Sequence, residues 1–207
     1  MANNNPAAPQ AVMHTAEAPP AIADPAPLGL AGFGFTTLMA MTIAAGIISN
    51  GATAAVLPMA AAFGGTAQFL AGMWAFRRGN TFAATAFSAF GAFWWSYYLL
   101  IDVFLKQITP ASAVGPIVGL YFCAWFIFTA YMFIASLHGT RAVQSVFLLL
   151  TVTFAFLAIS FWNWFGASVT LGHIAGYIGI LTAIAALYTS FADVLNATAR
   201  RVILPTN

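Results

Sequence analysis

The 207-residue chain is 62% hydrophobic and only 5% charged, with six Lys/Arg, four Asp/Glu and a formal net charge of +2. A soluble domain of this length carries roughly fifty charged residues, so the composition excludes a soluble enzyme. A net charge of +2 also cannot supply the basic surface that follows nucleic-acid phosphates. The sequence therefore predicts an all-α integral membrane protein.

The positions of the charged residues predict six transmembrane helices, because charge-free stretches run over 25–76, 79–101, 107–140 and 142–192. A helix needs about 20 apolar residues to cross a hydrocarbon core of about 30 Å, so these stretches hold two, one, one and two spans. Turn residues at 49–51 and interfacial aromatic residues at 162–166 divide the two long stretches. The expected helices cover 28–49, 53–76, 80–102, 114–137, 142–161 and 171–195.

The two ends of the chain lie outside the expected helices. Residues 1–24 are rich in Ala, Pro and Asn and are predicted to be a disordered tail. Residues 25–199 form the predicted six-helix transmembrane domain, and residues 200–207 form a short C-terminal tail.

The basic residues predict the orientation in the cell membrane. With six spans, five arginines fall on the same side as both termini, and only Lys106 falls on the other side. The positive-inside rule then places both termini and the 200–207 tail in the cytoplasm. The five arginines are Arg77, Arg78, Arg141, Arg200 and Arg201.

No catalytic motif or metal-ligand cluster is found in the sequence, so no enzyme activity and no cofactor are expected. The three histidines, His14, His138 and His173, are scattered, and Cys123 has no partner cysteine. The acidic residues in the expected helices lie near the helix ends. A proton-coupled pump, in contrast, usually keeps a carboxylate near the middle of a helix.

Small residues and side-chain amides lie inside the expected helices. The pairs Gly115/Gly119 and Gly172/Gly176 are of the kind that let helices pack closely. The amides of Gln68 and Gln144 each need a partner in hydrocarbon, which is either another helix or a polar solute.

A hydroxyl stripe on the third expected helix comprises Thr81, Thr85 and Ser88. It either lines a wet pore or bonds back to its own helix.

Several short segments resemble a known family of membrane proteins. The segment Asp24-Pro25-Ala26-Pro27-Leu28-Gly29-Leu30 resembles the Asn-Pro-Ala-Pro-Leu-Gly-Leu signature of the acetate uptake transporters, also called succinate–acetate permeases. The resemblance extends over about 25–205. It continues in the segments 63–68, 71–73, 78–82, 85–87, 194–196 and 204–205.

The resemblance implies transport of small carboxylates, chiefly acetate and succinate, through a six-helix protomer that assembles as a homohexamer with one pathway per protomer. Matched by position, it implies a constriction formed by Phe33, Phe90 and Leu150. The motif residues Asp24, Pro25, Pro27, Leu28 and Gly29 are expected to form the substrate entry, because the prolines fix an extended entry and the helix N-terminus that follows attracts an anion. Candidate polar contacts of the pathway are Thr36, Gln68 and Gln144, and Ala186 is a candidate selectivity residue.

Three positions depart from the family pattern. Phe90 replaces a Tyr, Asp24 replaces the motif's Asn, and Ala75 stands where relatives often have Glu. If Phe90 faces the pathway, the Thr81–Thr85–Ser88 stripe points about 200° away, against another helix or protomer.

Two other functions remain open on the sequence alone. One is a hexameric amide or urea channel, for which Gln68 and Gln144 are suitable contacts. The other is a membrane sensor without transport activity. The sequence also leaves open whether the chain is a channel or a proton symporter.

Overall fold

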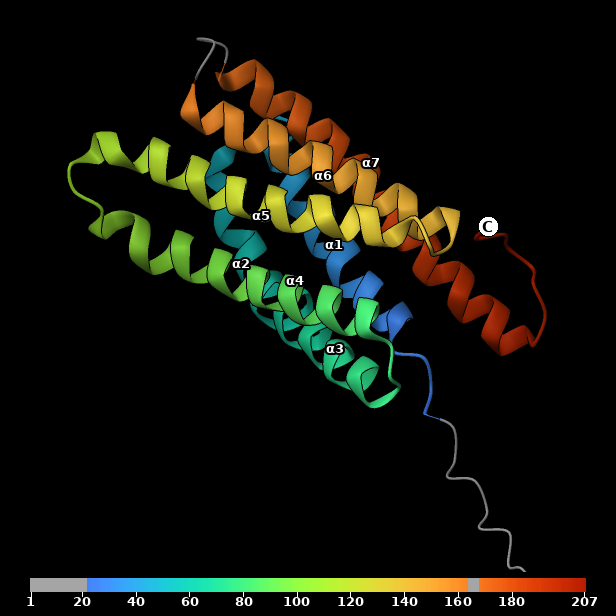
Figure 1. The fold of residues 1–207 in the computed structure, drawn as a ribbon. Coiled ribbons are helices and arrows are strands. Elements are labelled where there is room, and N and C mark those ends of the chain that lie inside the picture. Colours follow the sequence, from blue (N-terminus) through green and yellow to red (C-terminus); the bar gives the residue numbers. More distant parts are fainter. Residues whose placement is uncertain (1–21, 164–167) are drawn as a thin grey trace, which may run out of the picture.

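A computed structural model describes residues 22–163 and 168–207, which fold into helices joined by short turns (Figure 1). Within these residues, six helical segments are long and apolar enough to cross a membrane, which confirms the predicted number. The predicted N-terminal tail lies almost entirely outside the described residues. The main helices are α1 (Ala26–Ala44), α3 (Gln68–Arg77), α4 (Thr81–Leu99), α5 (Val114–Ser136), α6 (Arg141–Trp162) and α7 (Ser168–Ala199).

The second span, Asn50–Arg77, is not a uniform α-helix. It begins as a 3-10 segment, Asn50–Ala55, and continues as the short helix α2 (Val56–Met59). The next eight residues, Ala60–Ala67, form a π-helical segment, and α3 follows directly. The third span also changes its winding beyond α4, with a π segment at Leu100–Phe104 and a 3-10 turn at Leu105–Gln107.

The first helix ends five residues earlier than the sequence predicts. The chain turns at Gly46, whose φ of +75° lies in the left-handed region that favours glycine. Ser49 then caps the 3-10 segment by accepting a hydrogen bond from the Gly51 amide at 3.3 Å. The turn residues at 49–51 therefore lie between the first two spans, as predicted. They mark the start of the second span, because the first span has already ended at Ala44.

Polar caps set the starts of α4 and α6. The Asn80 side chain accepts a hydrogen bond from the Ala83 amide at 3.0 Å, and the Thr140 hydroxyl accepts one from the Val143 amide at 3.4 Å. Both bonds satisfy amides that have no partner within the helix. The starts of these two helices agree with the predicted ones to within one residue.

The spans lie side by side as an elongated bundle (Figure 1). α1 packs against α7 on one side and against the second span on the other. α7 contacts α6, α6 contacts α5, and α3 contacts α4, so the chain forms a ring of neighbouring helices. The backbones of α4 and α5 approach each other less closely, and aromatic side chains fill the space between them, among them Phe93 and Trp125 with ring centroids 5.0 Å apart.

The predicted glycine pairs are used for packing within the chain. A Cβ on Gly176 of α7 would lie 2.5 Å from the Cα of Ala45, so only glycine allows this approach. A Cβ on Gly119 of α5 would lie 2.7 Å from the indole of Trp162. Gly119 and Gly176 therefore serve close packing within the protomer.

Candidate transport pathway

Two cavities enter the bundle from opposite ends. The first, which we call the Trp94 cavity, measures about 280 Å³ and extends to Asn50 and Val114. The second, the Asp193 cavity, measures about 330 Å³ and extends to Asn80 and Thr140. Both are lined mainly by residues of α1, α4 and α6, together with parts of α5.

A narrow segment lies between the two cavities. Its volume is about 20 Å³, which leaves room for about one water molecule. Phe33 and Leu150 line both this segment and the Trp94 cavity, whereas Leu30 and Phe147 line both this segment and the Asp193 cavity. The three spaces therefore follow one another through the bundle. The narrow segment is lined by Leu30, Phe33, Gln68, Ala86, Phe87, Phe90, Val146, Phe147 and Leu150.

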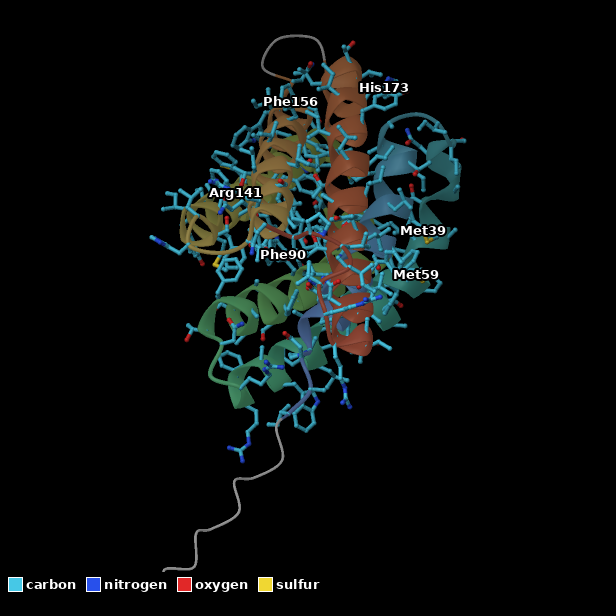
Figure 2. All side chains as sticks on the ribbon, turned by 90° about the vertical axis from the view of Figure 1, so that its right-hand side faces the viewer. Met39, Met59, Phe90, Arg141, Phe156 and His173 are labelled. Atoms are coloured by element: carbon cyan, nitrogen blue, oxygen red, sulfur yellow. The ribbon has the colours of Figure 1, made fainter. Side chains whose placement is uncertain are left out.

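The three residues expected at the constriction come together in this narrow segment from three different helices. Phe33 on α1, Phe90 on α4 and Leu150 on α6 are each 3–4% exposed. The rings of Phe33 and Phe90 are 5.8 Å apart between centroids. Figure 2 shows Phe90 near the middle of the bundle, far from His173 near the start of α7.

Phe90 is held by an aromatic cluster. Besides Phe33, its ring contacts Trp125 and Phe128 of α5 at centroid distances of 5.9 and 5.3 Å, and Phe147 of α6 at 6.2 Å. Aromatic pairs in this distance range contribute a stabilisation in addition to that from the area they bury. The ring of Phe90 thus closes the seam between α4 and α5 at the level of the narrow segment.

Gln68 supplies the polar group of the narrow segment. Its side chain is 1% exposed, and its Oε1 atom has no hydrogen-bond partner within the part of the chain that the structure describes. A buried polar atom without a partner costs about 1–3 kcal/mol, so such atoms in native proteins call for a reason. A solute or a water molecule in the narrow segment would supply the missing partner.

Two further buried polar atoms that have no hydrogen-bond partner among residues 22–163 and 168–207 belong to residues that line the Trp94 cavity. They are the Thr37 hydroxyl oxygen and the Trp94 indole nitrogen. Thr37 lies four residues after Phe33 on α1, and Trp94 lies four residues after Phe90 on α4, so both are one helical turn from the narrow segment. Neither residue was predicted from the sequence, although a spacing of four residues from Phe33 and from Phe90 places each of them on the same helix face as an expected constriction residue.

The remaining predicted polar contacts lie elsewhere. Thr36 is fully buried on α1, and its hydroxyl donates a 2.8 Å hydrogen bond to the Gly32 carbonyl. Gln144 lies in the first turn of α6, where its amide donates to the carbonyls of Gly139 and Leu137 and its Oε1 accepts from Arg141 at 2.9 Å. Neither Thr36 nor Gln144 is among the described lining residues of the two cavities or the narrow segment.

Gln144 was interpreted as an amide in hydrocarbon that needs a partner from another helix or a solute. The structure instead gives it partners in the adjacent loop, because α6 begins only three residues before it. Ala186 is fully buried in α7 and is likewise not among the described lining residues.

The Asp24–Leu30 motif begins α1 beside the Asp193 cavity. Asp24 accepts a 3.0 Å hydrogen bond from the Ala26 amide and lies 3.8 Å from Arg78 in an exposed ion pair. The Pro27 carbonyl accepts a 2.7 Å hydrogen bond from the Ser190 hydroxyl of α7. Pro25 and Gly29 are buried, and Leu28 is 46% exposed. The negative charge that replaces the motif's Asn is therefore paired with an arginine.

Titratable side chains line the Asp193 cavity near its mouth. Asp193 comes from α7, and His138 comes from the turn between α5 and α6. The sequence placed both residues near the helix ends but gave no reason to bring them to one cavity.

The hydroxyl stripe on α4 behaves as its angle to Phe90 implies. Ser88 packs against α3, where a Cβ on Gly72 would lie 2.6 Å from the Ser88 amide nitrogen. Thr81, Thr85 and Ser88 are not among the described residues lining the pathway. Ser88 therefore packs against another helix, as its angle to Phe90 implies, whereas the expected bond back to its own helix is wrong for Ser88, because its buried Oγ atom has no hydrogen-bond partner within the described residues.

Comparison with known proteins identifies relatives over most of the chain. The model of the GPR1/FUN34/yaaH family matches residues 7–207. The chain is 38% identical to the succinate-acetate/proton symporter SatP of Escherichia coli K12 over 184 residues, which cover 89% of this chain and 95% of that protein. It is 32% identical to acetate permease A of Emericella nidulans over 194 residues, covering 88% of this chain and 65% of the permease.

The fold is also similar to a solved structure, that of the bacterial acetate channel SatP. The TM-score is 0.81 at 35% identity, and the match covers 90% of this chain and all of the other.

Proposed function

The chain belongs to the GPR1/FUN34/yaaH family of multi-pass membrane transporters, and we propose that it moves small carboxylates such as acetate and succinate across the membrane. The observation that carries this proposal is the sequence of spaces through the protomer: two cavities of about 280 and 330 Å³, separated by a narrow segment of about 20 Å³. Such an arrangement suits a pathway in which the substrate passes one narrow point. Two relatives, the succinate-acetate/proton symporter of Escherichia coli and acetate permease A of Emericella nidulans, support the substrate class.

Phe33, Phe90 and Leu150 form the constriction of this pathway in our proposal, and Gln68 is its polar contact. The apolar ring excludes hydrated ions, because an ion must lose its water shell to enter. The methyl group of acetate meets the aromatic and leucine side chains, while its carboxylate accepts a hydrogen bond from the amide nitrogen of Gln68, which leaves the Oε1 atom, unpartnered among the described residues, to accept from water. The Trp94 cavity adds the unpartnered polar groups of Thr37 and Trp94 one turn away.

The proposed orientation places both termini in the cytoplasm. Asp24, Arg78, Thr140 and Thr206 lie at one end of the bundle, since Asp24 pairs with Arg78 and the Thr206 carbonyl accepts a hydrogen bond from the Ala142 amide. The positive-inside rule assigns this arginine-rich end to the cytoplasm. The Asp193 cavity then faces the cytoplasm and the Trp94 cavity faces the outside. Each protomer of the proposed homohexamer contains its own pathway.

A flux measurement in proteoliposomes tests the function. We expect saturable uptake of labelled acetate that succinate competes and that acetamide does not. Setting the pH gradient and the membrane potential independently separates an anion channel, which follows the potential, from a proton symporter, which follows the pH gradient. Stronger competition by acetamide than by succinate would indicate the amide channel instead, and vesicles that pass neither solute would indicate a sensor.

A further inference from the structure

The π-helical segment Ala60–Ala67 lies directly before Gln68 in the second span. π-helices are rare and are frequently found at functional sites. A change of one residue in helical register turns every following residue by about 100°. The π winding upstream therefore decides whether Gln68 faces the narrow segment.

Three polar groups from two helices meet at this π segment. The indole nitrogen of Trp95 on α4 donates to the Ala61 carbonyl at 3.2 Å and to the Thr66 hydroxyl oxygen at 3.3 Å. The Thr66 hydroxyl donates to the same Ala61 carbonyl at 2.9 Å. Ala61 and Thr66 are five residues apart, which is the hydrogen-bond spacing of a π turn and not of an α turn.

Gly65 allows Trp95 to come this close. A Cβ at this position would lie 2.5 Å from both the Trp95 indole nitrogen and the Ala60 carbonyl oxygen. A glycine and a hydroxyl residue in succession are therefore required here, and this gives a physical reason for the Gly65–Thr66–Ala67–Gln68 part of the motif found in the sequence.

Trp95 and Thr66 are not among the described residues that line the narrow segment or the two cavities. Thr66 is exposed on the outer surface of the protomer, and Trp95 is half-buried. Thr66 can influence the pathway only through the second span, whereas Trp95 can act through the second span or through its neighbour Trp94 on α4. Gln68, in contrast, is buried and lines the narrow segment.

We propose that Trp95 and Thr66 are positioning residues: their hydrogen bonds to Ala61 hold the π segment, and the π segment holds the Gln68 amide in the narrow segment. This inference rests on the proposed role of Gln68 as the polar contact of a carboxylate pathway. Loss of these hydrogen bonds shifts the segment toward α-helical winding and turns Gln68 away from Phe33 and Leu150.

A double-mutant cycle of acetate flux tests the inference, with flux normalised to folded protein in the proteoliposomes. Gln68→Leu should lower the flux about tenfold, as expected for one lost hydrogen bond to the carboxyl group. Thr66→Val, which is nearly isosteric, and Trp95→Phe, which keeps an aromatic ring but is smaller, both remove the hydrogen-bonding group and should each lower the flux by about threefold or more. In the Gln68→Leu background both should change the flux by less than about 1.5-fold, because the group they position is gone.

Two control substitutions remove an indole or a hydroxyl at positions outside the contact between Trp95, Thr66 and Ala61. Trp74→Phe removes an indole at an exposed position of α3, and Thr42→Val removes a hydroxyl that bonds only to the Leu38 carbonyl four residues earlier. Both should leave the flux unchanged. Equal losses for Trp95→Phe with and without Gln68 would overturn the inference, as would an unchanged flux in both Trp95→Phe and Thr66→Val.

A structural measurement separates this inference from the proposed function. Electron cryomicroscopy of Trp95→Phe and of Thr66→Val in lipid nanodiscs should show a shortened π segment and a Gln68 side chain outside the narrow segment. An intact π segment with Gln68 in place would refute the positioning role even if acetate flux is confirmed. If the wild-type protein passes no acetate, the proposed function fails, whereas this structural result still decides the positioning role.

Discussion

The Ser190 hydroxyl of α7 donates a 2.7 Å hydrogen bond to the Pro27 carbonyl at the start of α1. The two residues are 163 positions apart in the chain, so this bond joins the first and last spans. Both helices flank the Asp193 cavity, which Ala26 and Asp193 line. The bond therefore holds the Asp24–Leu30 motif in its place at the mouth of that cavity.

Replacing Ser190 by Ala should lower the stability of the folded protomer by about 1 kcal/mol, the typical net value of one hydrogen bond. The measurement is thermal unfolding of the detergent-solubilised protein, followed by tryptophan fluorescence. Ser145→Ala is the matched control, because the Ser145 hydroxyl is exposed and bonds only within α6, to the Arg141 carbonyl. An identical unfolding temperature for Ser190→Ala and the wild type would show that the bond contributes nothing.

The two glycines of the Gly172/Gly176 pair should respond differently to the same substitution. Gly176→Ala places a Cβ against the backbone of Ala44 and Ala45, which should cost about 1–3 kcal/mol or more. Gly172→Ala meets its nearest atom, the Ser160 hydroxyl oxygen, only at 3.9 Å. Since alanine favours helix by about 0.8–1.0 kcal/mol over glycine, Gly172→Ala should be neutral or stabilising.

The amount of folded protein and its unfolding temperature in detergent check this pair together. A larger loss for Gly172→Ala than for Gly176→Ala would contradict the packing of α7 on the end of α1.

Much of this fold follows from the sequence because the membrane imposes simple rules. The predicted number of spans was correct, because the spacing of the charged residues can be read directly from the sequence. The predicted starts of α4 and α6 were correct to within one residue, because the capping residues Asn80 and Thr140 act locally. The end of α1 was wrong because the left-handed turn at Gly46 outweighs the apolar run that continues past it. The π segment was not foreseen either, since the side chain that hydrogen-bonds to it, Trp95, lies 34 positions further along the chain than Ala61.

The candidate site could be predicted in part. The resemblance brought Phe33, Phe90, Leu150 and Gln68 to attention, and the structure gathers these four residues in one narrow segment. It did not reveal that Gln144 has partners in its own loop, because those partners depend on where α6 begins. Helical spacing from Phe33 and Phe90 was the information needed to find Thr37 and Trp94.

The proposed topology gives a labelling prediction. With Cys123→Ser as background, single cysteines at Thr109 and Asn207, both exposed positions, should react with an impermeant maleimide from opposite sides of the membrane. Intact cells should label only the cysteine at 109, and inverted vesicles only the cysteine at 207. Labelling of both from outside intact cells is incompatible with an even number of spans and cytoplasmic termini.

Leu150 gives the sharpest prediction on selectivity. It is 3% exposed and lines both the narrow segment and the Trp94 cavity, so its truncation to Ala should widen the proposed constriction. Bulkier acids such as lactate should then pass, because the steric barrier against them falls. Discrimination of one methylene or hydroxyl in an apolar site is worth roughly 1–3 kcal/mol, so the lactate-to-acetate flux ratio should rise by about 10- to 200-fold.

Leu157→Ala is the matched control for this experiment. Leu157 is also buried on α6 and lines the Trp94 cavity, but it is not among the residues that line the narrow segment. Both truncations should lower stability by about 2–5 kcal/mol through the cavity that each leaves. Only Leu150→Ala should change the flux ratio per folded protein, because only there does the lost volume lie at the narrow point. An unchanged ratio in Leu150→Ala would remove Leu150 from the constriction and with it the main support for assigning Phe33 and Phe90 to the same ring.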